Sequence, residues 1–246
     1  MSTAAASPSF LCRLQNRHEV AEGTMAFHFE KPAGWTFKPG QYVDMTLLDP
    51  AETDSEGNIR SFSIASAPHE DTLMVATRMR DTAFKRVLKT MPLETQVKIE
   101  GPLGSFTLHR DASRSAVFLA GGIGITPFRS MLVNAAHMGL ANRIVLLSSN
   151  RRPEDSAFLQ ELQELENKNK NCKVIGVMTE MEKSQRPWHG ETGFIDKAML
   201  GRAVPDGAAA FYYIAGPPAM VAAMNKTLAS AKVSEDDIRS EDFSGY

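Results

Sequence analysis

Hydrophobic and polar positions follow two different patterns along the 246-residue chain. As far as about Leu108, short segments that alternate polar and apolar residues are separated by Gly, Pro and Asn. Alternation with a period of two is typical of strands, and six of them at this spacing indicate a small antiparallel barrel. We predict strands at residues 10–20, 25–31, 41–48, 61–66, 72–79 and 96–101, and one helix at residues 83–91.

Beyond about residue 110, buried strands alternate with longer segments of helical periodicity. This alternation is typical of a doubly wound parallel sheet with helices on both faces. We predict strands at residues 116–120, 143–149, 172–179 and 210–215, and helices at residues 127–138, 154–169 and 217–231. The chain therefore divides into an antiparallel barrel domain, residues 1–110, and an α/β domain, residues 111–246.

Composition narrows the class of protein. The chain has 27 Lys and Arg against 29 Asp and Glu, so no bulk charge attracts nucleic acid or an anionic membrane. No apolar run approaches the roughly 18 residues of a membrane span, and the first residues lack a secretory signal, so we expect a cytoplasmic protein. Two distant cysteines, Cys12 and Cys172, and scattered histidines predict no metal site of the chain's own.

A glycine-rich segment, Gly121-Gly-Ile-Gly-Ile-Thr-Pro127, follows the first strand of the α/β half. Glycines let backbone N–H groups approach a ligand, and the N-terminus of the next helix favours phosphate. Thr126 is predicted as the N-cap of that helix and Pro127 as its first residue. A second turn, Ala215-Gly-Pro-Pro218, follows the last strand, and together the turns favour dinucleotide binding over turns without a ligand.

The barrel half contains the strand Arg60-Ser-Phe-Ser-Ile-Ala-Ser66. Alternate residues of a strand face the same way, so Arg60 and Phe62 share one face and Ser61 and Ser63 the other. The segment offers a guanidinium for phosphate, an aromatic ring for a flat ligand and hydroxyls for ring heteroatoms. Alone it is a weak signal, because surface strands with Arg and Ser are common.

Five segments taken together resemble the ferredoxin–NADP reductase superfamily, and they occur in that family's order. The resemblance implies a flavin-binding β-barrel followed by a nicotinamide-dinucleotide domain, with hydride passing between the two cofactors where the domains meet. The segments are Arg60-Ser-Phe-Ser63, Gly101-Pro-Leu-Gly104, Gly121-Gly-Ile-Gly-Ile-Thr-Pro127, Gly216-Pro-Pro-Ala-Met220 and Glu241-Asp-Phe243.

The resemblance also implies roles for individual residues. Arg60 is similar to the arginine that holds the flavin phosphate, Phe62 stands where most members have a Tyr that stacks on the flavin, and Ser63 is similar to the hydroxyl that faces flavin N5. Members with a helix in the barrel half commonly hold FAD, so we expect FAD rather than FMN. The further cofactor-binding residues implied are Ser61, Thr77, Arg78, Ala83, Phe84, Lys85, Gly121, Gly122, Gly124, Thr126, Arg151, Gly216, Pro217, Met220 and Tyr246.

The implied catalytic residues are Ser63, Thr126, Glu241 and Phe243. Phe243 is expected to cover the second face of the flavin; Tyr246 is the alternative, and a chain end without a role is another. Ala215 replaces the Cys that many members have beside the nicotinamide, so any role of that thiol is absent.

The choice between NADH and NADPH depends on the segment after the third strand of the α/β half. Members that prefer NADPH usually carry Ser or Thr followed by Arg there, whereas this chain has Thr179-Glu180. A carboxylate repels a 2′-phosphate, which favours NADH. The basic residues that could counteract it are Arg151, Arg152, Lys183 and Arg186.

We therefore expect an FAD-dependent oxidoreductase that takes hydride from NAD(P)H and passes electrons to an external acceptor, such as ferredoxin, flavodoxin or an oxygenase component. The alternatives are a flavin or ferric-chelate reductase with a diffusible acceptor, and a non-catalytic flavin-binding electron-transfer subunit. A basic stretch either steers an acidic carrier or holds the flavin pyrophosphate; it comprises Arg78, Arg80, Lys85, Arg86 and Lys89.

Overall fold

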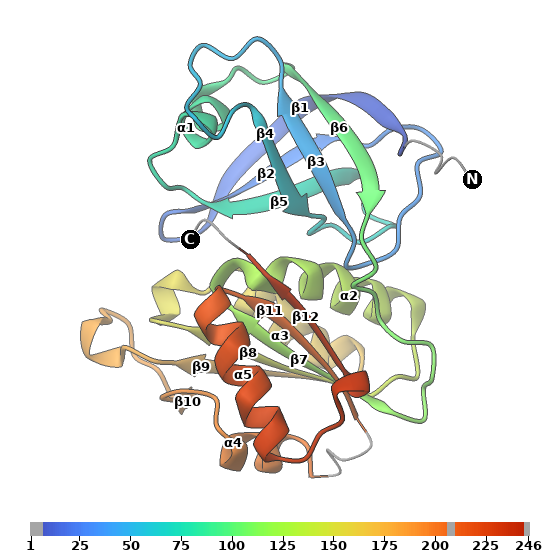
Figure 1. The fold of residues 1–246 in the computed structure, drawn as a ribbon, viewed down its shortest axis with the longest axis vertical. Coiled ribbons are helices and arrows are strands. Elements are labelled where there is room, and N and C mark those ends of the chain that lie inside the picture. Colours follow the sequence, from blue (N-terminus) through green and yellow to red (C-terminus); the bar gives the residue numbers. More distant parts are fainter. Residues whose placement is uncertain (1–6, 206–209, 244–246) are drawn as a thin grey trace.

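The computed structural model describes residues 7–205 and 210–243, which form two domains stacked one above the other (Figure 1). The N-terminal domain is a curled, six-stranded antiparallel sheet in the order β4-β3-β6-β1-β2-β5. This confirms the predicted barrel-like domain. Its elements are β1 (Ser9–Ala21), β2 (Thr24–Glu30), β3 (Tyr42–Leu47), β4 (Ile59–Ser63), β5 (Thr72–Arg78), α1 (Ala83–Thr90) and β6 (Gln96–Leu103).

The helix α1 closes one end of the barrel core. Thr82 caps it, because its hydroxyl oxygen accepts a hydrogen bond from the backbone N–H of Lys85 at 3.4 Å. Phe84 and Leu88 lie one turn apart and are fully buried among the inward-facing residues of the strands. Burial of these two side chains fixes which face of α1 points into the barrel.

The C-terminal domain is a parallel sheet in the order β10-β9-β8-β7-β11-β12. One apolar cluster joins α2 and α3 to one face, and another joins α4 and α5 to the opposite face, which confirms the doubly wound fold. Its strands are β7 (Ser115–Gly121), β8 (Ile144–Asn150), β9 (Cys172–Met178), β10 (Glu191–Thr192), β11 (Ala210–Gly216) and β12 (Ile238–Asp242). Its helices are α2 (Ile125–Met138), α3 (Leu159–Lys168), α4 (Lys197–Ala203) and α5 (Pro218–Ser230).

Two predicted helix starts were wrong. A 3₁₀ turn, Gly122–Gly124, leads directly into α2, so Gly124 is the N-cap and Thr126 lies inside the helix. The hydroxyl of Thr126 donates to the Ile123 carbonyl at 3.0 Å instead of capping. Helix α3 begins only at Leu159, because Phe158 has a φ of +59°, a left-handed conformation that interrupts a right-handed helix.

Two strand predictions also differ from the structure. Strand β4 begins at Ile59 and ends at Ser63, so residues 64–66 run beyond it towards the second domain. Strand β12 was not predicted, since Ile238–Asp242 has four polar residues and no apolar alternation. It joins the sheet edge by pairing in parallel with β11, which places Glu241 beside Ala215.

The two domains are joined by a buried guanidinium on α2. Arg129 is only 6% exposed, and all five of its N–H donors are used. It makes bidentate contacts of 2.9 and 3.1 Å with Glu70 of the barrel, and of 2.9 and 2.5 Å with Glu161 of α3. It also donates to the carbonyl of Ala65 at 2.8 Å, while the next residue, Ser130, donates to the carbonyl of Ser66 at 2.7 Å.

A second contact joins the β1–β2 hairpin to the segment after β8. The backbone N–H of Glu22 donates to the carbonyl of Glu154 at 2.9 Å, and Arg152 lies 3.1 Å from the Glu22 carboxylate. Arg152 is also held by Asp155, which lies 3.8 Å from Arg78 of β5. The relative position of the domains is therefore set at two separate places.

Arg129→Met is expected to lower the free energy of unfolding by about 2–4 kcal/mol, measured by chemical denaturation followed by circular dichroism. The substitution keeps the apolar stem but removes the charge from between two carboxylates, which recover only part of their hydration. Arg202→Met is the control, because Arg202 and its partner Glu191 are both largely exposed. A loss no larger than that of the control would contradict a structural role for the Arg129 contacts.

Candidate functional site

The side chain of Arg60 projects from β4 and is 20% exposed. Its guanidinium lies over the ring of Phe84, 5.2 Å from the centroid. One nitrogen, Nη1, donates to the carbonyls of Glu56, Gly57 and Ile59, and the other, Nη2, contacts the Glu56 carboxylate at 2.7 Å. Arg60 is thus held in one orientation by the loop before its own strand.

The aromatic residues predicted to meet the flavin are largely part of the barrel core. Phe62 is 8% exposed and packs against Phe84, with the ring centroids 5.9 Å apart. Phe84 is 1% exposed, so its ring belongs to the core and does not form an open stacking surface. Ser61 and Ser63 point to the other face, as predicted; Ser61 donates to Asp44 at 2.5 Å, and Ser63 pairs with Tyr42 of β3.

Basic groups gather near the N-terminus of α1. Burial lowers the pKa of the Lys85 ammonium, and the nearby guanidiniums of Arg80 and Arg60 lower it further. The three cations therefore lie close enough to repel one another, and helix N-terminal N–H groups add positive potential. Of the other basic residues nearby, Arg78 lies by Asp155, and Arg86 pairs with Glu52 and Asp81. This arrangement favours phosphate binding over carrier docking for Lys85.

The two glycine turns of the α/β domain pack directly against each other. A Cβ on Gly121 would lie 2.2 Å from the sulfur of Met220, and one on Gly124 would lie 2.1 Å from the carbonyl oxygen of Ala215. These glycines are explained by packing. Gly122 differs, because it has a φ of +53° and its missing Cβ would point into open space. Its backbone is therefore the part of the turn that a ligand can approach.

Phe243, which follows β12, contacts residues of both domains near this turn. Its backbone N–H donates to the carbonyl of Gly216 at 2.9 Å. Its ring packs on a cluster that contains Ile123 from the glycine turn and Ala65 and Ala76 from the barrel. Tyr246, the alternative to Phe243, lies outside the described residues.

Charges at the end of β9 are paired with one another. The Glu180 carboxylate lies 2.7 Å from Nζ of Lys183 and 3.7 Å from Nε of Arg151. The hydrogen bond from Lys183 lowers the pKa of Glu180, which keeps it ionised. Arg152 is held by Asp155 and Glu22. Of the four basic residues that could bind a 2′-phosphate, three are therefore paired with carboxylates of the chain: Arg151, Arg152 and Lys183.

Each domain matches the model of a known protein family. A family model of the oxidoreductase FAD-binding domain matches residues 11–108, and one of the oxidoreductase NAD-binding domain matches residues 118–226. Together they cover most of the chain in the expected order. The chain belongs to the ferredoxin–NADP reductase superfamily of flavin-dependent oxidoreductases.

Similar proteins of this superfamily include reductase components of oxygenases. The glycine betaine monooxygenase reductase subunit of Chromohalobacter salexigens is 27% identical over 223 residues, which are 89% of this chain and 60% of that protein. The propane 2-monooxygenase reductase component of Rhodococcus jostii is 28% identical over 220 residues, 87% of this chain and 57% of that protein. The chain thus spans about three-fifths of the length of these relatives.

A crystal structure with the same fold is that of the cytochrome P450 reductase from Amycolatopsis. It aligns with a TM-score of 0.81 and 22% identity, covering 98% of this chain and 73% of that one. The superposition includes both domains, so the fold of the superfamily extends across the whole described chain.

The residues of this superfamily member fit a flavin nucleotide and a dinucleotide. Ala83 at the start of α1 already donates its backbone N–H to a carboxylate, that of Asp54, at 3.0 Å, so this helix end accepts an anionic oxygen. In the second domain, the open face of Gly122 leaves the backbone free for a phosphate. Sequence patterns had pointed to both places, but not to Arg129 or Asp54, whose partners come from distant segments.

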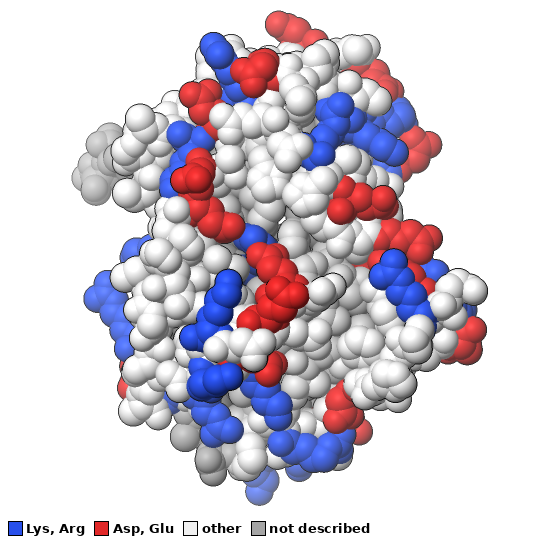
Figure 2. All heavy atoms as spheres, turned by 180° about the vertical axis from the view of Figure 1, so that it is seen from behind, with Lys and Arg blue, Asp and Glu red and all other residues white. Residues whose placement is uncertain are grey.

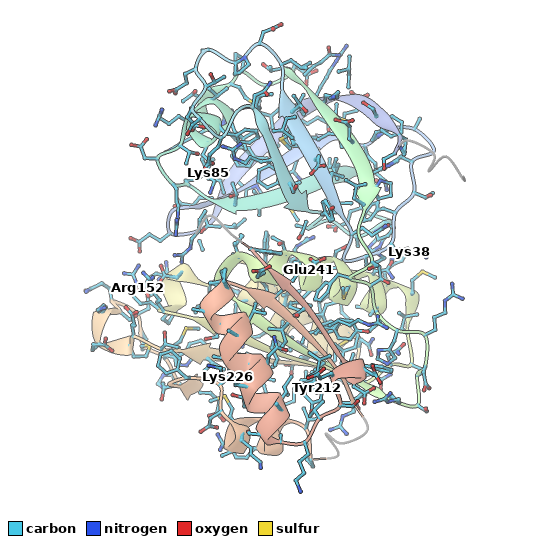
Figure 3. All side chains as sticks on the ribbon, in the orientation of Figure 1. Lys38, Lys85, Arg152, Tyr212, Lys226 and Glu241 are labelled. Atoms are coloured by element: carbon cyan, nitrogen blue, oxygen red, sulfur yellow. The ribbon has the colours of Figure 1, made fainter. Side chains whose placement is uncertain are left out.

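Glu241 is an acidic group at the junction of the domains whose pKa is strongly raised. Figure 3 shows it at the end of β12 that faces the barrel. Desolvation by burial raises the pKa of its carboxyl to about 7. A carboxyl with this pKa exchanges protons near neutral pH, as a general acid or base requires.

Glu241→Gln is expected to stabilise the protein more at pH 8 than at pH 5. The folded-state pKa is raised above the ordinary value of 4.5, so the wild type loses stability as the pH rises from 4.5 through 7, whereas the Gln variant does not. The measurement is the midpoint of chemical denaturation at both pH values, with Asp242→Asn as the control for removing one charge from β12. A difference between variant and wild type that does not change with pH would contradict the raised pKa.

Proposed function

We propose that this chain is an NADH-dependent FAD reductase that passes electrons to a redox protein outside the chain. One observation carries the proposal: the contacts of α2 hold the end of β4 against the glycine turn of the second domain. Ala65, two residues beyond Ser63, shares one apolar cluster with Ile123 and Phe243. The residues implied for flavin and for nicotinamide thus meet at one interface, as hydride transfer requires.

The two cofactors supply the redox chemistry: bound FAD takes up hydride from the nicotinamide and releases electrons singly or in pairs. The chain binds, orients and shields them. Arg60, Lys85 and the N-terminus of α1 would bind the flavin phosphates. Thr77 and Arg78 would line the pyrophosphate or the ribityl group of the cofactor. Gly122 contacts the dinucleotide pyrophosphate, and the turn of Gly216 and Pro217 lies across from it.

Other residues act at the reacting rings. Ser63 would donate a hydrogen bond to the flavin ring, and Phe62 would pack beside the ring from the barrel core. Phe243 would cover the second face of the flavin. Thr126 is 2% exposed and bonded to Ile123, so it supports the glycine turn from within, and Glu241 exchanges a proton at the junction. We place the domain boundary between residues 110 and 111, in the segment that joins β6 to β7.

The preference for NADH rests on Glu180. Its carboxylate is kept ionised by Lys183, and it engages the same cations that a 2′-phosphate would need. An ionised carboxylate accepts hydrogen bonds from the ribose hydroxyls of NADH and repels the phosphate of NADPH.

The electron acceptor is proposed to be an oxygenase component or a ferredoxin. Support comes from the relatives, which are reductase components of monooxygenases. On the face shown in Figure 2, basic and acidic groups are interspersed over both domains, so charge on that face does not mark a docking area.

We propose a cytoplasmic location. The thiols of Cys12 and Cys172 are both free and buried, as is usual where the cell keeps thiols reduced. Among the helices of the described residues, none is both long and apolar enough to cross a membrane.

The direct experiment is anaerobic reduction. The purified protein should be yellow, its flavin should bleach with NADH faster than with NADPH, and reoxidation should be fast with a ferredoxin or oxygenase component. Yellow protein that neither nucleotide bleaches would indicate a non-catalytic flavin-binding subunit. Rapid reoxidation only by free FMN or a ferric chelate would indicate a reductase with a diffusible acceptor.

Ser63→Ala is expected to keep its flavin but to reduce it more slowly, by about tenfold to a hundredfold at saturating NADH. The hydroxyl aligns the flavin for hydride arrival, which matters more in the transition state than in binding. Anaerobic stopped-flow gives the limiting rate, and flavin content serves as the internal control. An unchanged limiting rate would remove Ser63 from the site.

A further inference from the structure

Three carboxylates of the β3–β4 connection alternate along residues 52–56 and are directed at α1 and β4. They are Glu52, Asp54 and Glu56. In Figure 1 this connection, at the upper end of the barrel, passes beside α1. No pattern in the sequence singles them out, since an acidic surface loop is ordinary. The partners of Asp54 and Glu56, however, are the groups that would bind the phosphates of a flavin.

Asp54 bridges the end of α1 and the guanidinium of β4. Its Oδ2 accepts the backbone N–H of Ala83 at 3.0 Å, and its Oδ1 lies 3.6 Å from Nη2 of Arg60. Oδ1 also accepts the backbone N–H of Glu56 at 3.0 Å, which fixes the loop. The pKa of Asp54 is lowered, first by the Ala83 N–H and further by Arg60, so it remains an anion. The carboxylate therefore sits where a phosphate oxygen would find both donors.

Glu56 forms a second ion pair with Arg60. Its Oε2 lies 2.7 Å from the same Nη2 that faces Asp54. The Arg60 side chain is only 20% exposed, so its donors are directed into this loop rather than into solvent. A phosphate that approaches Arg60 must displace Glu56, Asp54 or both.

Glu52 lies in the same loop but forms its ion pair with a different residue, Arg86. It makes contacts of 2.9 and 2.5 Å with Arg86, on the outer side of α1. The Arg86 guanidinium contacts Glu52 and Asp81, and it lowers the pKa of Asp54 less than Arg60 does. Glu52 thus provides an internal comparison: a carboxylate of the same loop that should not affect a ligand at Arg60.

We propose that Asp54 and Glu56 occupy the phosphate positions of the flavin site and determine its affinity for phosphate-bearing flavins by competing with them. The proposal rests on the proposed function, since it assigns the ligand of Arg60 and α1 to a flavin. The apparent affinity equals the intrinsic affinity multiplied by the fraction of molecules in which the loop is already displaced. A contact of Arg60 with Asp54 or Glu56 that must break before a phosphate can bind is therefore a contact that weakens flavin binding.

The experiment compares Asp54→Asn and Glu56→Gln with Glu52→Gln as the matched control. Flavin is removed from each protein, and FAD, FMN and riboflavin are titrated back by fluorescence quenching. Asp54→Asn and Glu56→Gln are expected to bind FAD and FMN about three- to tenfold more tightly, because removing one competing charge is worth roughly a salt bridge of this exposure. Riboflavin has no phosphate, so its affinity should not change. The Glu52→Gln variant should match the wild type with all three flavins.

A second measurement separates competition from a purely structural role. The melting temperature of the flavin-free protein should fall in Asp54→Asn and Glu56→Gln, although their FAD affinity rises. Weaker FAD binding in these variants would show that the carboxylates position the site, which would overturn the proposal. Equal tightening of riboflavin would also overturn it, because the gain would not depend on phosphate.

Inorganic pyrophosphate tests the same site without a flavin. It should raise the melting temperature of Asp54→Asn and Glu56→Gln more than that of the wild type or Glu52→Gln. If no variant binds any flavin, the proposed function fails, and the pyrophosphate result still decides this inference. An equal pyrophosphate effect in all four proteins would contradict competition at Arg60.

Discussion

The buried guanidinium of Arg129 is the interaction on which the arrangement of this molecule depends. It lies between a carboxylate of the barrel and one of α3, and it also holds the backbone just beyond β4. A desolvated charge with all its donors used tolerates little displacement, because any shift leaves a buried charge unpaired. Ser130 adds a neutral hydrogen bond to the next carbonyl. The distance between the two halves of the site is therefore set by α2, the helix that begins at the glycine turn.

Anionic ligands of this protein must compete with its own carboxylates. Arg60 is paired with Glu56 and lies near Asp54, and Arg151 lies near Glu180. Such pairs keep the basic groups in place before a ligand arrives, but they reduce the net attraction that a phosphate experiences. At Arg60 the consequence is the proposed competition with the flavin phosphate. At Arg151 the consequence is the proposed preference for a nucleotide without a 2′-phosphate.

The glycine turn shows how one segment combines packing and binding. Gly121 and Gly124 have no room for a side chain because the second glycine turn and Met220 press against them. Gly122 alone has open space and a left-handed backbone. A glycine-rich pattern read from sequence treats all three as ligand contacts, whereas close packing against Met220 and Ala215 accounts for two of them.

The sequence by itself determined the two-domain plan, most of the barrel strands and the main alternation of strands and helices in the second domain, although it missed β10, α4 and β12. These predictions follow from periodicity and turn residues, which are local properties of the sequence. Helix starts were less well determined, because the 3₁₀ turn at Gly122 and the left-handed Phe158 depend on packing.

Only the tertiary structure decided which charges meet. Arg129 finds partners 59 and 32 positions away, and Asp54 reaches an N–H that is 29 positions along the chain. Glu241 has its raised pKa because the unpredicted strand β12 carries it into the junction between the domains. Hydrogen bonds and desolvation act over a few ångströms in space and are indifferent to separation in sequence. For that reason no local pattern could indicate them.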